Sequence, residues 1–139
     1  MVARYELYTD GGSRGNPGLA ACAFVVVETA TQKIIHEANK TLGIATNNEA
    51  EYQGFIESVN WVLDQKWKNE YLVWKLDSLL VVQQLNSVWK IKDARMRVFA
   101  QTAWEKLKKL TNSYTIQHIP REQNSRADAL LNQALDLLS

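Results

Sequence analysis

The chain has 139 residues, of which 46% are hydrophobic, and it contains only two prolines and six glycines. This composition favours one compact domain over residues 1–139 and argues against a disordered chain or two separate domains. The 16 lysines and arginines nearly balance the 15 aspartates and glutamates, and the net charge of +1 does not by itself indicate a polyanionic partner.

The cysteine content and the apolar segments bear on the cellular compartment. Cys22 is the only cysteine, so it forms no internal disulfide, and its place in an apolar run predicts a small packed side chain. The first residues are too polar for the core of a signal peptide, and no apolar stretch approaches the length that spans a bilayer. We therefore expect a cytoplasmic protein with no membrane partner.

The first third of the chain predicts three strands. Residues 3–9 alternate apolar and polar side chains and run into Asp10-Gly11-Gly12, a sequence typical of a turn. Extended apolar runs at 20–28 and 34–42 flank a short polar segment, and the glycine-rich residues 11–18 connect the first two strands. These three strands are expected to form an antiparallel meander.

Helical patterns dominate the rest of the chain and alternate with two further strands. Thr46-Asn47-Asn48-Glu49 has the form of a capping box, and apolar side chains then recur at helical spacing as far as Leu63. The later pattern predicts, in chain order, a strand at 71–76, a short helix at 79–85, a loop at 86–92, a helix at 93–110, a strand at 114–119 and a terminal helix at 127–138. Strands separated by helices tend to pair in parallel, so we expect an α/β fold in which helices cover a mixed sheet.

Four acidic residues fall at the ends of these elements. Asp10 ends the first strand, Asp77 ends the fourth, and Glu51 and Asp128 lie in the first turns of two helices. If the first and fourth strands are parallel neighbours, their carboxyl ends share the edge of the sheet where ligands usually bind. Carboxylates gathered there repel one another unless a cation neutralises them, and an all-oxygen ligand set favours Mg²⁺ or Mn²⁺ over zinc. Two such ions about 4 Å apart suit the hydrolysis of a phosphodiester.

Each of these acids also has an ordinary structural explanation. Asp10 fits a simple turn, Glu51 a favourable contact with the helix dipole, and Asp77 an N-cap, although Ser78 serves equally well there. Asp128 follows Ser125 at the spacing of a capping box, whereas Glu49 is better explained as the capping partner of Thr46 than as a metal ligand. The case for a shared site rests on the four residues together.

Four segments resemble the motifs of the type 1 ribonuclease H family, and they occur in the family's order over nearly the whole chain. They are Tyr8 to Gly18, Thr46 to Glu51, Leu76-Asp77-Ser78, and His118 to Asp128. The resemblance implies a ribonuclease H-like fold, a five-stranded mixed sheet with three antiparallel strands, then two parallel strands, and flanking helices. It also implies that Asp10, Glu51, Asp77 and Asp128 bind metal ions and catalyse cleavage of the RNA strand of an RNA·DNA hybrid, leaving 5′-phosphate and 3′-hydroxyl ends.

The resemblance further implies a set of contacts with the hybrid. Asn16, Thr46, Asn47 and Asn48 are expected to contact it, because amides and hydroxyls can bond base edges and 2′-hydroxyls in a wide minor groove. Turn formation at Asn16 and helix capping at Thr46 are the structural alternatives. The predicted substrate contacts are completed by Gly12, Ser78, Trp89, Lys90 and Arg121.

The chain departs from the family pattern in three places. Arg121-Glu122-Gln123 occupies the loop where many members carry a mobile histidine, so Arg121 or Glu122 is the candidate substitute. His118 is interpreted as a packed or hydrogen-bonded strand residue in preference to a catalytic acid. The long basic protrusion of some relatives is missing, and its nearest substitute is the segment from Trp89 to Lys92 with Arg95 and Arg97, although a solvated loop is equally compatible. Relatives often differ at Leu19, Ala21 and Leu79, which predicts a weaker grip on the substrate.

Three functions remain open at this point. The first is a freestanding, monomeric endoribonuclease acting on hybrids, which Met1 and the complete set of elements favour. The second is a catalytically weak module of the same fold that binds hybrids or double-stranded RNA. The third is a related nuclease for double-stranded RNA or DNA junctions. The four acids favour an enzyme, and the Thr46-Asn47-Asn48 set favours hybrids.

Overall fold

The computed structural model describes residues 2–138 and contains, within them, one five-stranded sheet and four α-helices. In chain order the elements are β1 (Arg4–Arg14), β2 (Gly18–Glu28), β3 (Lys33–Ala45), α1 (Asn47–Asp64), β4 (Tyr71–Leu76), α2 (Leu79–Leu85), α3 (Ala94–Leu107), β5 (Tyr114–His118), a 3₁₀ turn (Arg121–Gln123) and α4 (Ser125–Asp136).

The strands lie in the order β3-β2-β1-β4-β5 across the sheet. β1 to β3 pair antiparallel, whereas β1 with β4 and β4 with β5 pair in parallel, which confirms the predicted mixed sheet. The register between β1 and β4 ends at Thr9 opposite Leu76. The residue that follows each of these two in the chain is one of the predicted acids, so the topology brings Asp10 and Asp77 to the same edge.

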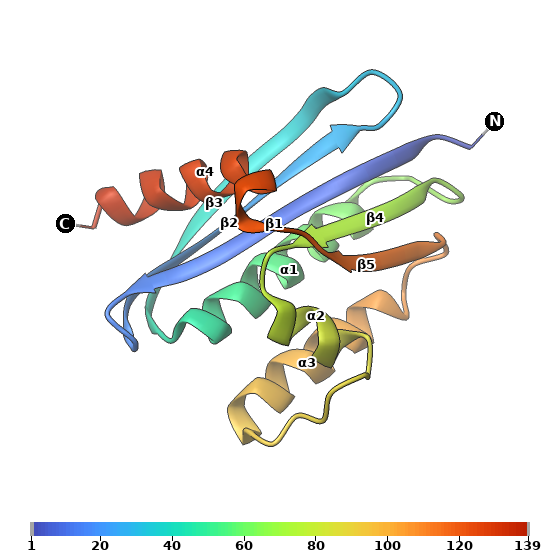
Figure 1. Ribbon diagram of the computed structural model, residues 1–139. Helices are drawn as coiled ribbons and strands as arrows, with labels where there is room; N and C mark the ends of the chain where they lie inside the picture. Colours follow the sequence, from blue (N-terminus) through green and yellow to red (C-terminus); the bar gives the residue numbers. More distant parts are fainter. Residues whose placement is uncertain (1, 139) are drawn as a thin grey trace.

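The helices cover both faces of the sheet (Figure 1). α1, α2 and α3 lie on one face and α4 lies on the other. β2 contributes to both layers, because Phe24 and Val26 pack in the core beneath α1 while Ala23 and Val25 pack in a second core against α4. Burial on both faces explains why the sequence of β2 is an unbroken apolar run instead of an alternating one. Cys22 is buried there as a free thiol, as predicted.

The boundary of β1 differs from the prediction. The expected turn at Asp10-Gly11-Gly12 is absent, because β1 continues to Arg14 and pairs with β2 over its whole length. The turn follows at residues 15–17, where Gly15 has φ +91°, a left-handed conformation that favours glycine. Asp10 therefore lies inside a strand, and its turn interpretation is wrong.

The later boundaries also shift. α3 ends at Leu107, earlier than expected. α4 begins at Ser125 with Asn124 as its N-cap, so the capping-box alternative for Ser125 and Asp128 is wrong. His118 lies in β5 as expected, but it is exposed, so the packed alternative for its side chain is wrong.

Candidate active site

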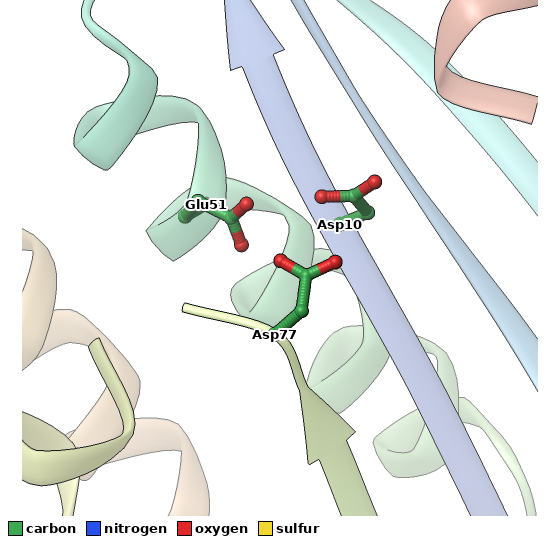
Figure 2. A group of neighbouring side chains, drawn as sticks. All are labelled: Asp10, Glu51 and Asp77. Carbon is green, nitrogen blue, oxygen red and sulfur yellow. The ribbon is translucent and has the colours of Figure 1, made fainter. Parts of the chain in front are cut away.

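Three acidic side chains converge at the edge where β1 and β4 part. Asp10 extends from β1, Asp77 follows the last residue of β4, and Glu51 lies in the first turns of α1. One carboxylate oxygen from each residue lies within 4.8 Å of the others. Figure 2 shows the three carboxyl groups pointing toward one another. Asp10 and Glu51 are buried, whereas Asp77 is partly exposed.

Two glycines allow α1 to approach β1 closely enough to place Glu51 beside Asp10. A Cβ atom at Gly11 would lie 2.1 Å from the Ala50 carbonyl oxygen, and a Cβ atom at Gly54 would lie 2.6 Å from the Asp10 carbonyl oxygen. Both distances are too short for any side chain. Gly11 in the Asp10-Gly11-Gly12 segment therefore serves helix packing, not a turn.

A capping box fixes the first turn of α1. The Thr46 hydroxyl accepts a hydrogen bond from the Glu49 amide at 3.1 Å, and the Glu49 carboxylate accepts one from the Thr46 amide at 2.9 Å. The second carboxylate oxygen of Glu49 lies 2.9 Å from the Arg95 guanidinium on α3. Glu49 is thus occupied structurally, as predicted, and Glu51 is left for the site.

The three acids are poorly neutralised by their surroundings. Burial raises the pKa of Asp10 to about 7, and the negative charges of Asp77 and Asp128 raise it further. Hydrogen bonds from Glu51 and from the Gly11 amide partly offset this rise. Burial also raises the pKa of Glu51 well above its ordinary value, with the charge of Asp10 as the next cause. One buried oxygen of Glu51 has no hydrogen-bond partner among the described residues. Closely spaced carboxylate oxygens, one of which has no partner, form a donor set that fits a hard divalent cation.

Asp128 lies in the same cleft but outside this group of three. It lines the cleft from the first turn of α4, and its carboxylate is 3.7 Å from the exposed guanidinium of Arg121. The structure therefore places the fourth predicted acid near the others without bringing its oxygens as close.

The cleft around the acids holds several of the predicted substrate contacts. Its volume is about 460 Å³, and its lining includes Gly12, Asn47, Asn48, Ser78 and Arg121. Ser78 also caps α2, so the capping alternative for Asp77 is wrong. Arg14 and Asn132 line the cleft as well, although no sequence pattern singled them out, because only the pairing of β1 with β2 and the docking of α4 bring them there.

Asn16 and Thr46, the other two residues predicted to contact the minor groove, lie beside the cleft. Asn16 accepts a hydrogen bond from the Asn47 amide at 3.0 Å, and the Asn47 side-chain oxygen accepts one from the Ser13 amide at 2.8 Å. Asn16 and Thr46 face a smaller neighbouring pocket together with Arg95. The turn before α1 is therefore tied to the connection between β1 and β2.

Trp89 and Lys90 line a separate groove. This groove, about 610 Å³ in volume, lies between the segment 86–93 and α3 and is also lined by Lys92, Arg97 and Trp104. Trp89 is 42% exposed, so an aromatic surface lies among three cationic side chains. Arg95, which the sequence grouped with this segment, points instead to Glu49.

The comparisons with known proteins agree with this geometry. Residues 8–134 match the family model described as reverse transcriptase-like. Ribonuclease HI of Halobacterium salinarum is 41% identical over 133 residues, covering 96% of this chain and 65% of that protein. The chain thus spans about two thirds of the length of this curated relative.

Solved structures show the same relationship. The crystal structure of RNase H1 from Halobacterium salinarum NRC-1 superposes with a TM-score of 0.88 at 40% identity, covering 96% of this chain and 98% of that one. LC11-RNase H1, crystallised in complex with an RNA/DNA hybrid, superposes with a TM-score of 0.91 at 33% identity, covering 97% and 99%.

The fold and the converging acids define the ribonuclease H-like class of α/β proteins. The sequence is more than 30% identical to each of the two solved RNase H1 chains over nearly their whole length, which narrows this class to one family. The chain belongs to the type 1 ribonuclease H family. Among residues 2–138, no helix has both the length and the apolar character needed to span a membrane.

Proposed function

We propose that this protein is an endonuclease that hydrolyses the RNA strand of RNA·DNA hybrids. The observation that carries the proposal is the group of three carboxylate oxygens within 4.8 Å at the edge of the sheet. The names of its relatives, and the hybrid bound to LC11-RNase H1, support the choice of substrate. We further propose that it acts as a single domain and as a monomer in the cytoplasm.

Asp10, Glu51 and Asp77 would hold divalent cations, with Asp128 as a further ligand at the rim of the cleft. Bound as a pair, Mg²⁺ or Mn²⁺ ions would supply an activated water and stabilise the leaving oxygen of the phosphodiester. The chain itself fixes the oxygens in place and excludes water around Asp10 and Glu51, which are 4% and 7% exposed. This chemistry would leave 5′-phosphate and 3′-hydroxyl ends.

The polar wall of the cleft suits the minor groove of a hybrid. Asn47 and Asn48 stand beside the acids, and Asn16 and Thr46 anchor their turn. Side-chain amides and hydroxyls can bond the 2′-hydroxyls that distinguish RNA from DNA. Gly12 and Ser78 line the same cleft and complete the proposed contacts with the RNA strand.

The groove at Trp89 suits the second strand. Trp89 offers a surface on which a base or sugar can stack, and Lys90 offers a charge for a phosphate. Arg121, whose side chain is 81% exposed beside Asp128, is placed to contact a phosphate at the cleft. We propose that it takes the place of the loop histidine that the family resemblance implies.

An Asp10→Asn variant tests the reaction. It should fold as the parent does and lose Mg²⁺-dependent cleavage of a labelled hybrid, because one oxygen ligand becomes an amide. The matched control is Asp64→Asn, which removes an exposed carboxylate at the end of α1 and should keep full activity. Full activity in Asp10→Asn would refute the proposal.

Competition among substrates separates the remaining functions. Labelled hybrid, double-stranded RNA and junction DNA are mixed in one reaction, and cleavage of the hybrid alone is the expected result. Binding of the hybrid without cleavage in Mg²⁺ or Mn²⁺ would instead show a binding module.

A further inference from the structure

Asn124 is a buried polar residue whose side chain contacts the segments that carry the acids. It is 1% exposed and is among the largest side chains that are fully buried. Its side-chain nitrogen donates to the Thr9 carbonyl at 2.9 Å and to a carboxylate oxygen of Asp77 at 3.1 Å. Thr9 immediately precedes Asp10, so one amide group holds the segments that carry two of the three clustered acids.

Asn124 does not perform the usual function of its position. It is the N-cap of α4, where an asparagine ordinarily accepts a hydrogen bond from an amide of the first turn, yet its side chain makes no capping bond. Its side-chain oxygen is buried and has no hydrogen-bond partner among the described residues. Leaving that oxygen unpaired costs stability, so the orientation of the side chain serves something other than the helix.

The backbone of Asn124 reaches the fourth acid. Its carbonyl oxygen accepts a hydrogen bond from the Asp128 amide at 3.1 Å. The residue therefore contacts β1 next to Asp10, the carboxylate of Asp77 and the backbone of Asp128. These three segments are far apart in the chain and meet only in the fold.

We propose that Asn124 is a positioning residue that fixes the carboxylate of Asp77 relative to Asp10 before a cation binds. A neutral amide suits this place, because both of its partners can only accept hydrogen bonds and its nitrogen supplies two protons. A lysine or arginine there would place a competing positive charge against the acids. This role rests on the proposed metal-dependent function.

The chain offers a closely matched control in Asn112. Its side-chain nitrogen also donates to a backbone carbonyl and to a carboxylate oxygen, both of Glu70, at 3.0 and 3.4 Å. Asn112 is buried as well, but it lies before β5, at the end of that strand away from the acids. Asn124→Leu and Asn112→Leu each remove an amide that bonds to a backbone carbonyl and to a carboxylate. Comparing the two variants separates an effect on the position of the acids from an effect on the stability of the fold.

Mn²⁺ binding to the protein without nucleic acid, measured by isothermal titration calorimetry, is the direct test. Loss of a group that orients a metal ligand typically costs 10–100-fold, so Asn124→Leu should bind Mn²⁺ at least about tenfold more weakly than the parent. Asn112→Leu should bind as the parent does, even if its unfolding temperature falls by the same amount. In hybrid cleavage, kcat should fall for Asn124→Leu while KM stays unchanged, because the buried side chain cannot touch the substrate.

The outcomes are distinguishable. Equal Mn²⁺ affinity in the parent and Asn124→Leu, or an equal loss in Asn112→Leu, overturns the inference alone. No Mn²⁺ binding by the parent refutes the proposed function and the inference with it. If Asn124→Leu does not fold, Asn124→Ser decides the question, because it retains only one donor and should bind Mn²⁺ more weakly than the parent; unchanged affinity in that variant overturns the role.

Discussion

Replacing Gly54 by alanine tests whether the spacing between α1 and β1 sets the geometry of the acids. The added Cβ would lie 2.6 Å from the Asp10 carbonyl oxygen and 3.3 Å from the Cys22 Cβ, whereas ordinary contact begins at 3.4 Å. The atom it meets first is backbone, which cannot rotate away. α1 must therefore move from β1 by about 0.8 Å, and Glu51 must move with it.

The expected effects on stability and on activity differ in size. Alanine gains about 1 kcal/mol over glycine in a helix, and overpacking costs about 1–3 kcal/mol, so the net loss should not exceed about 2 kcal/mol. Misplacing a catalytic group by about 1 Å can cost on the order of 10²-fold in rate. Gly54→Ala should therefore remain folded and lose most of its activity.

Urea denaturation and hybrid cleavage, measured on the same preparation, check this prediction. Gln53→Ala, at the neighbouring position of α1, is the control for helix propensity and should keep parental activity. Parental kcat in Gly54→Ala would show that the close approach of the helix is not needed by the site.

Three further predictions concern stability and binding. Thr46→Ala should lower the free energy of unfolding by about 1 kcal/mol in urea denaturation, because α1 loses its cap. Trp89→Ala should weaken hybrid binding by about 1–3 kcal/mol in a titration without divalent cations, with no change in unfolding temperature. Burial raises the pKa of Glu6, but hydrogen bonds from Lys75 and Gln32 outweigh it, so its pKa lies below the ordinary 4.5. This contribution to stability is present above pH 4.5 and disappears as the pH falls through the lowered pKa, so the gap in unfolding temperature between the parent and Glu6→Gln should close on acidification.

The fold could be predicted in most respects because local signals and topology agree. The capping box at Thr46 and the helical periodicity behind it mark α1 unambiguously. The error at Asp10-Gly11-Gly12 arose because glycine has two uses that look alike in sequence. A turn needs its conformational freedom, whereas here the contact of Gly11 with α1 needs its lack of a side chain.

The acids of the candidate site could be predicted from the sequence, but the residues that hold the surrounding segments in place could not. Motif order placed Asp10, Glu51, Asp77 and Asp128 together. The first three converge, whereas Asp128 lies in the same cleft outside their group. Arg95 was grouped with the basic segment near Trp89, but its partner is Glu49, and nothing local to either residue indicates that pairing. Asn124 was hidden for the same reason, because its partners on β1 and after β4 become neighbours only when the sheet forms.

The contacts of Asn124 bear on the stage of protein synthesis at which the acids of the candidate site can take up their final arrangement. The side chain that holds Asp77 lies close to the carboxyl end of the described residues, while Thr9 lies close to their amino end. A polypeptide still emerging from the ribosome exposes its early acids before that amide exists to arrange them. On the role proposed for Asn124, the acids reach their final arrangement only after the segment that precedes α4 has been synthesised and packed against β1 and β4.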